Sequence, residues 1–307
     1  MSNDSNSAIA FIEKLVNRLF DQLIRGDYNF TRDFKALERY TEQARKLNAP
    51  LLEARALNVM AILHNVSGRS DEAETYFLNV VKLYRQQENH SGLAATYGNL
   101  ATVNTTRGEY EIALDYYHQG LALKDENNYQ FLLSSKMSVL LTLERYDDID
   151  ACYAELKIIM DKPISTAEKA NYARFMSGVY RTMAEVHLHR QQIDEAKSTI
   201  NMARDFAQGL NLTFGLAEIY FTDAHIALLH DKDETQADTY WETARDTLKG
   251  IHSPSHIGRS YLEEARYLKR KGCGEKSEEF ARRALGIFER YEMATDIAMT
   301  QELLALR

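Results

Sequence analysis

The sequence has few residues that break helices. Three prolines and 14 glycines occur among 307 residues, too few for the many tight turns of a sheet-rich fold. No stretch approaches the roughly 18 uninterrupted apolar residues of a membrane span, and the N-terminus lacks the basic segment and apolar run of a signal peptide. The composition therefore predicts a mostly helical, cytoplasmic protein without a membrane partner.

Cysteine and positive charge are also scarce. Cys152 and Cys273 cannot build a disulfide framework or a Cys-rich zinc site, which favours a reducing compartment. Lysine and arginine number 37 against 45 aspartates and glutamates, a net charge of −8. Because binding to phosphate backbones needs net positive surfaces, we expect no nucleic-acid partner. A basic path along one local face remains compatible with this balance.

Motifs of catalysis and cofactor binding are missing. The chain has no phosphate-binding Gly-Lys-Ser/Thr loop, no Gly-x-Gly-x-x-Gly, no His-Glu-x-x-His and no Gly-x-Ser-x-Gly. His187 and His189 lie two residues apart, so a helix would point them in different directions and prevent shared metal binding. The Asp231–Asp233 tripeptide lacks the Gly and Glu of a calcium loop. The sequence thus predicts a protein that is not an enzyme and holds no cofactor or metal.

An internal repeat of about 40 residues organises most of the chain. Each unit has two helical segments joined by a turn, and small residues recur in the second segment, with bulky residues four positions further on. Equivalent positions are Ala73, Ala113, Ile149, Ala196, Ala237 and Ser277, of which four are alanine, and the unit with Met137 and Ile149 departs from the pattern. The first segments carry Ala61, Ala101, Met137, Ala184 and Ala265 twelve residues earlier, and Ala224 fits if its turn holds one extra residue.

These small residues allow two antiparallel helices to approach closely, while the bulky neighbours fill the space beside them. Turns agree with this layout. Gly26, Gly68, Gly108 and Gly272 fall between the two helices of their units, where a left-handed residue ends a helix. Pro50, Pro163 and Pro254 fall between one hairpin and the next, where a helix must stop.

The two ends of the chain differ from the repeats. Residues 1–50 are expected to form an N-terminal helical hairpin, with helices near 6–25 and 32–47 and Ala36 in the small-residue position. This pair is either a degenerate repeat or a small effector bundle. Residues 51–291 form the predicted repeat array, and residues 292–307 a C-terminal helix that caps the last apolar face.

The unit at residues 94–123 resembles the tetratricopeptide repeat family, through Tyr97, Leu100, Ala101, Gly108, Tyr110, Ala113, Tyr117 and Leu121. The longer spacing is similar to that of kinesin light chain, polarity adaptors and bacterial peptide-pheromone receptors. The resemblance implies an all-α, right-handed solenoid of six to seven hairpins. It also implies a concave face, lined by the first helices, that holds an extended peptide or a partner helix.

Residues predicted on that inner face lean toward positive charge, with seven lysines or arginines against three acidic residues. This favours an acidic peptide, or a terminal carboxylate, bound by arginine; arginines that merely keep a helix face soluble are the alternative. Asn99 matches an asparagine that, in the resembled branch, bonds to the peptide backbone, and Asn58 lies one position off. The candidate groove residues are Arg55, Asn58, Asn99, Thr102, Arg181, His225, Arg259 and Arg266.

The sequence therefore predicts a protein-protein interaction scaffold or regulator that binds a peptide in its groove. An alternative is the sensor module of a bacterial signalling protein, with an output domain beyond the chain or with a response regulator as its target. Self-association into a homo-oligomer is a further alternative, since repeat proteins often pair through end faces. The identity of the partner and the pathway do not follow from the sequence.

Overall fold

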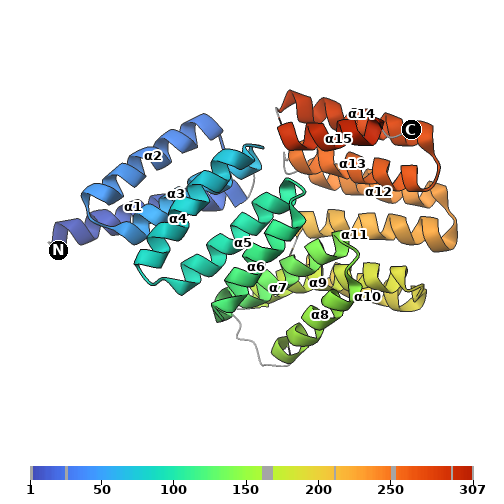
Figure 1. Ribbon diagram of the computed structural model, residues 1–307, viewed down its shortest axis with the longest axis horizontal. Coiled ribbons are helices and arrows are strands. Elements are labelled where there is room, and N and C mark those ends of the chain that lie inside the picture. Colours follow the sequence, from blue (N-terminus) through green and yellow to red (C-terminus); the bar gives the residue numbers. More distant parts are fainter. Residues whose placement is uncertain are drawn as a thin grey trace. The chain divides into compact units, whose positions relative to one another are not determined.

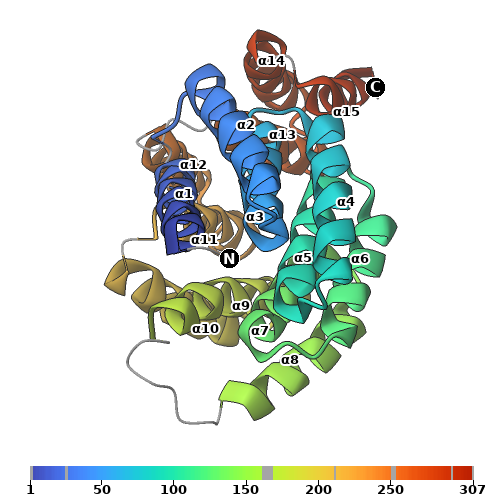
Figure 2. The ribbon, with the colours of Figure 1, turned by 90° about the vertical axis from the view of Figure 1, so that its left-hand side faces the viewer.

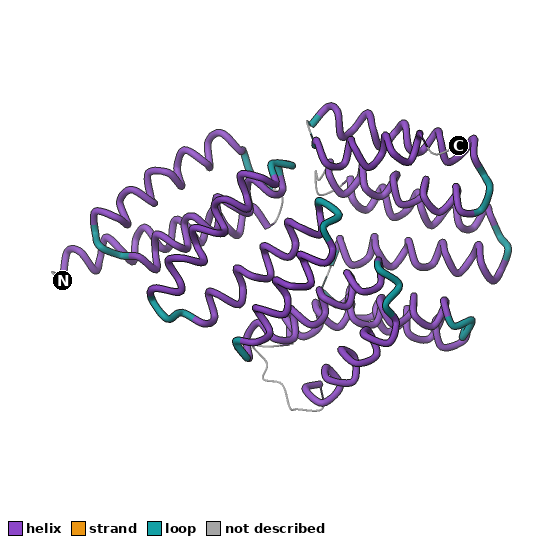
Figure 3. Tube along the Cα trace, viewed as in Figure 1, coloured by secondary structure: helices purple, strands orange, loops and turns teal. Residues whose placement is uncertain are grey.

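A computed structural model describes residues 3–24, 27–160, 169–210, 212–249, 254–291 and 293–305. Within these ranges all regular structure is helical, and no strand occurs (Figures 1 and 3). The elements are α1 (Asn3–Ile24), α2 (Phe30–Lys46), α3 (Pro50–Val66), α4 (Ser70–Gln86), α5 (His90–Thr106), α6 (Tyr110–Ala122), α7 (Glu126–Thr142), α8 (Tyr146–Met160), α9 (Lys169–His189), α10 (Ile193–Gly209), α11 (Thr213–Ile226), the π-helical η1 (Ala227–Asp231), α12 (Glu234–Lys249), α13 (Pro254–Arg270), α14 (Gly274–Arg290) and α15 (Ala294–Ala305).

The helices form consecutive antiparallel hairpins, and the prediction of an all-α solenoid is confirmed. Helices α3 to α6 show the arrangement in both Figures 1 and 2, where each hairpin stacks on the next. The chain divides into two compact units. The first unit joins residues 1–125 to residues 253–307, and the second comprises residues 126–252.

The predicted small-residue positions are the packing contacts of the hairpins. Ala73, Ala113, Ile149, Ala196 and Ala237 are fully buried, and Ser277 is 4% exposed. The bulky residues four positions on are buried beside them, as Phe77 and Trp241 show at 1% exposure. Because both helices present small groups at the crossing, their backbones can approach while the aromatic rings fill the flanks.

Left-handed residues end the first helices where the sequence predicted glycine. Gly68, Gly108 and Gly272 have φ of +79°, +76° and +78°. In the second unit the equivalent turns use Glu144, Gln191 and Lys232, all at positive φ, which costs free energy because these residues carry a Cβ. Gly26 lies outside the described residues.

Proline begins helices in this fold. Pro50 and Pro254 are the first residues of α3 and α13, where the missing N–H costs nothing. Pro163 lies outside the described residues. Ala36, predicted for the small-residue position of the N-terminal hairpin, is half-buried, and α2 instead buries Asp33, Leu37, Thr41 and Ala44.

Asp33 is tolerated inside because it caps its own helix. Its Oδ2 accepts a hydrogen bond from the Asn29 backbone N–H at 2.8 Å, while Asn29 Oδ1 accepts one from the Arg32 N–H at 2.9 Å. This reciprocal cap satisfies exposed N–H groups at the start of α2. The side chain of Arg32 also pairs with Asp33 at 2.6 Å.

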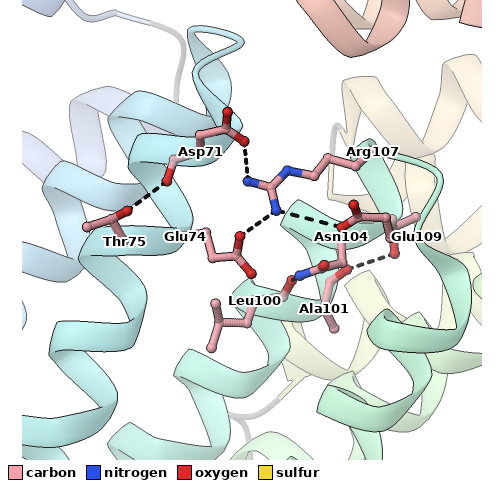
Figure 4. Close-up of polar contacts among 9 residues, drawn as sticks. Asp71, Glu74, Thr75, Leu100, Ala101, Asn104, Arg107 and Glu109 are labelled. Carbon is pink, nitrogen blue, oxygen red and sulfur yellow. Dashed lines mark hydrogen bonds and ion pairs between the residues drawn. The ribbon is translucent and has the colours of Figure 1, made fainter.

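An arginine cluster fastens the α3–α4 hairpin to the α5–α6 hairpin (Figure 4). Arg107, at the C-terminal end of α5, reaches back to α4 and donates to Glu74 and to Asp71 at 2.5 and 2.6 Å. Its side chain is only 11% exposed, and Glu109 lies 3.7 Å away. Arginine suits this position because its planar fork serves several carboxylates at once.

The expected extra residue between α11 and α12 is present. Ala224 is fully buried, as predicted, and lies thirteen residues before Ala237 instead of twelve. The chain takes up this residue in η1, a π-helical segment that ends at Lys232 with φ of +53°. A π turn holds one residue more than an α turn, so it restores the packing phase of the following helix.

None of the described helices is both long enough and apolar enough to cross a membrane. The predicted domain boundaries at residues 50 and 292 fall close to the start of α3 and of α15, and the division into three parts stays a prediction.

Candidate functional site

Helices α3 and α5 each leave two polar side chains uncovered on one face. On α3 and α5 most side chains are buried, but Arg55, Asn58, Asn99 and Thr102 remain exposed or half-buried. Spacings of three or four residues place them on one side of each helix. We call these four residues and Glu13 of α1 the first-helix stripe.

Within the stripe, side chains of neighbouring first helices pair with each other. Arg55 Nη1 donates to Glu13 Oε1 at 2.7 Å, from α3 to α1. Asn99 Nδ2 donates to Asn58 Oδ1 at 3.1 Å, from α5 to α3. Thr102 instead bonds within its own helix, since its hydroxyl donates to the Gly98 carbonyl at 3.0 Å.

A pocket adjoins the start of this stripe. It has a volume of about 710 Å³ and is open to solvent. Seven of its eight lining residues are polar or charged, and they include Glu13, Arg18 and Asp21 of α1 together with Asp27. The mixed charges of this lining give it no single sign.

The second unit carries a comparable cluster on α9 and α11. Arg181 Nε lies 3.4 Å from Glu218 Oε2, and His225 Nδ1 lies 3.2 Å from Glu185 Oε1. Burial acts to raise the pKa of Glu185, but His225, Thr222 and Arg181 outweigh it and hold the pKa at about 2. Glu185 therefore stays ionised across the physiological range.

The two remaining candidates belong to α13 and also have acidic partners. Arg259 forms a two-point pair with Asp296 of α15, at 2.9 and 3.1 Å, and reaches Thr106 at 3.4 Å. Arg266 pairs with Glu263 of its own helix at 2.7 Å. The positive charge predicted for the inner face is thus compensated locally, since each of the four candidate arginines lies beside a carboxylate of this chain.

Six of the eight predicted residues belong to the first unit, and Arg181 and His225 belong to the second. Arg55, Asn58, Asn99 and Thr102 come together in the first-helix stripe, and Arg181 and His225 meet in the second unit. The acidic partners Glu13, Asp296 and Glu263 were not predicted. Glu13 could have been found from its spacing, because it precedes Arg55 by 42 residues, close to one repeat.

Comparison with known proteins agrees with the hairpin architecture. Residues 52–126 match the model of the tetratricopeptide repeat family. No curated protein matches the sequence. The fold is similar to a tetratricopeptide repeat protein from Parabacteroides merdae, with a TM-score of 0.53 and 15% identity over 94% of this chain and 98% of that chain.

Two further structures share the fold. One is a Rap protein complexed with Competence and Sporulation Factor, with a TM-score of 0.58 and 13% identity over 96% of this chain and 80% of that one. The other is the apo form of the quorum sensor NprR from B. thuringiensis, with a TM-score of 0.52 and 13% identity over 89% of this chain and 83% of that one. The predicted resemblance to tetratricopeptide repeat proteins, including bacterial peptide receptors, is confirmed at the level of the fold.

Proposed function

We propose that this chain is a protein-interaction module, without catalytic activity, that binds an extended segment of a partner protein along the first-helix stripe. The amide pair of Asn58 and Asn99 is the observation that carries this proposal. In their mutual hydrogen bond the NH2 group of Asn99 donates to the side-chain carbonyl of Asn58. Asn58 Nδ2 and Asn99 Oδ1 remain as one donor and one acceptor, matching the C=O and N–H of an extended peptide.

An acidic segment or a terminal carboxylate is the partner chemistry that we propose. Such a group would replace Glu13 as the ion-pair partner of Arg55. The exchange costs little, because Arg55 and Glu13 are 48% and 46% exposed and exposed ion pairs contribute about 0 to 1 kcal/mol. In the second unit Glu218 is the exchangeable partner of Arg181, since Glu218 is 55% exposed while Arg181 is 15% exposed.

Selection from a displayed library of random peptides tests this function and requires no named partner. The affinity of selected peptides is then measured for the Asn58→Ala, Asn99→Ala double variant. Two lost hydrogen bonds to the peptide predict a weakening of about 1 to 3 kcal/mol, or about five- to 150-fold. Enrichment of acidic residues or of free C-termini in the selected peptides tests the partner chemistry.

Asn79→Ala is the matched control, because Asn79 is an exposed asparagine on the second helix of the same hairpin as Asn58. We expect it to bind the selected peptides like the unchanged protein. Equal affinity in the double variant and the control would show that the first-helix stripe does not bind the peptide. Failure to select any peptide would contradict peptide binding itself.

A sensor module of a bacterial signalling protein is the second function that we propose. Its support is the fold shared with the NprR quorum sensor and with a Rap protein that was crystallised with a signalling factor. In this case the bound peptide would control an output domain beyond the chain or a response regulator. An assay for binding and dephosphorylation of response regulators would detect the latter, and the absence of both would count against it.

Self-association is our third proposal. The chain would again bind a protein, but the partner would be a second copy of itself. Phe11 of α1 is 64% exposed at the N-terminal end of the array, which supports contact through that end. Light scattering at increasing protein concentration tests it, and a constant monomeric mass would rule it out.

A further inference from the structure

The C-terminal segment of the first unit touches two turns that lie far away in the sequence. Met293, just before α15, lies against Gly68 in the turn between α3 and α4. Met299 of α15 lies beside Gly108 in the turn between α5 and α6. In both ribbon views the start of α15 lies beside the turn that precedes α4 (Figures 1 and 2).

The contact at Gly68 depends on the absence of a side chain. A Cβ at this position would lie 2.8 Å from Met293 Cγ, closer than real Cβ contacts. At Gly108 the corresponding distance to Met299 Sδ is 3.6 Å, an ordinary contact. Glycine is thus required at position 68 for two reasons: the backbone has a positive φ, and Met293 occupies the space that a side chain would need.

One polar bond supports this contact. Arg259 of α13 reaches Thr106 at the end of α5, with Nη1 and the hydroxyl 3.4 Å apart. The same guanidinium holds Asp296 of α15, whose side chain is 4% exposed. Arg259 therefore links the C-terminal helix to the third hairpin, while Lys269 fixes α15 from the other side by donating to the Leu303 carbonyl at 2.7 Å.

The hydrophobic cores on the two sides of this contact are separate. Met293 packs in a cluster with Leu262, Ala284 and Phe288, and with Ile297 and Leu303 of α15. The clusters of the first hairpins, around Leu37 and Phe77, contain no residue of the C-terminal segment. The contact can therefore open without exposing the cores of the first hairpins.

We propose that Met293 and α15 form a strap that docks reversibly on the glycine turns at Gly68 and Gly108 and holds the first unit closed. Opening the strap lifts Met293 and α15 away from these turns and loosens α15 on α13 and α14, while the first three hairpins stay folded. This inference goes beyond the proposed function, and its test needs no ligand. It also assigns Arg259, a candidate groove residue, to the closing contact.

The test compares two glycines that have the same backbone conformation. Gly68→Ala and Gly272→Ala place a Cβ at φ of +79° and +78°, but the added Cβ meets Met293 only at position 68, and nothing lies within 4 Å at position 272. Hydrogen exchange is read in peptides that cover residues 293–305. We expect Gly68→Ala to speed this exchange at least about tenfold more than Gly272→Ala does.

Gly68→Ala also strains the turn at position 68 itself. A double-variant cycle with Met293→Ala separates this strain from the effect on the strap. If the strap explains the effect, Gly68→Ala adds no further exchange at residues 293–305 once Met293→Ala has removed the overlap. The Met293→Ala variant should also leave exchange in α3 and α4 unchanged. Additive effects at positions 68 and 293, equal effects of the two glycine variants, or loss of protection in α3 and α4 on Met293→Ala would each overturn the proposal.

Discussion

His64 connects the stability of the first hairpins to pH. Its ring is 6% exposed, meets Phe30 and Phe34 edge-on, and stacks on Tyr76 with the ring centres 5.3 Å apart. Neither ring nitrogen has a hydrogen-bond partner among the described residues. Burial lowers the pKa of His64 because it disfavours the charged imidazolium, with Arg69 acting in the same direction and Glu72 against it.

A lowered pKa in the folded state makes acid destabilising. As pH falls below about 6.5, His64 binds a proton in the unfolded chain but not yet in the folded chain. The stability that is present above about pH 6.5 is therefore lost as pH falls through the lower pKa of the folded state. We expect the free energy of unfolding to fall by up to about 1.4 kcal/mol per pH unit in this range. Urea unfolding at neutral and at mildly acidic pH measures it.

His64→Leu should remove this part of the pH dependence, and His90→Gln should keep it because His90 is exposed. The same slope in His64→Leu and in the unchanged protein would show that another group is responsible.

Single residues could be predicted from the sequence where size alone decides. The alanines of the hairpin contacts were found because small side chains recur at one spacing. The burial of His64 could not be found, since it depends on how Phe30 and Phe34 of α2 lie against α3 and on Tyr76 of α4. Ala36 was misplaced because the N-terminal hairpin does not follow the spacing of the array.

Helix ends in the second unit carry avoidable strain. Gln191 ends α9 at φ of +60°, a conformation that costs an L residue about 1 to 2 kcal/mol. Gln191→Gly relieves this cost but loses part of the gain, because glycine is more flexible in the unfolded chain. We expect a net stabilisation of about 0.5 to 1 kcal/mol in chemical denaturation.

Gln191→Ala is the control for this turn, since it shortens the side chain and keeps the Cβ at the same backbone angle. Its stability should stay within about 0.5 kcal/mol of the unchanged protein, as is usual at exposed sites. Destabilisation by Gln191→Gly would show that the side chain, and not the backbone, matters at this position.

Helices and turns were the most predictable level of the structure. The sequence placed the N-terminal helices at 6–25 and 32–47, and the structure has them at Asn3–Ile24 and Phe30–Lys46. Turn glycines and the small-residue spacing both report local geometry, which explains this agreement. The non-glycine turns at Glu144 and Lys232 gave no such signal, because nothing in their residue type marks a positive φ.

At the scale of the whole molecule, stability should be local, because each hairpin of a repeat array packs on its neighbours. Ala196→Leu inserts bulk into the fully buried contact between α9 and α10. Overpacking of this kind costs about 1 to 3 kcal/mol. We expect faster hydrogen exchange in α9, α10 and α11, and unchanged exchange in α3 to α6.

Ala154→Leu adds the same side chain at an exposed position of α8 in the same unit and should leave exchange in both units unchanged. Faster exchange of α3 to α6 in Ala196→Leu would mean that the chain unfolds as one cooperative block.

The candidate site was predictable in part. The sequence identified Asn58 and Asn99 as candidates, and their separation of 41 residues, one more than the spacing from Ala73 to Ala113, still brings them together on neighbouring first helices. It did not predict that every candidate arginine would have a carboxylate beside it, because the count of charges along one face ignores which residues of the next hairpin come within reach. Arg259 shows this most clearly, since its partner Asp296 belongs to the C-terminal helix.

The π-helical segment at Ala227–Asp231 bears on how such arrays change length. One supernumerary residue would rotate every later side chain by about 100° if the helix simply continued. Here the extra residue is taken up within the single π-helical turn, and Trp241 of the next helix still points inward at 1% exposure. A π-helical segment at a hairpin tip therefore lets this array absorb one extra residue without changing which side of the next helix faces inward.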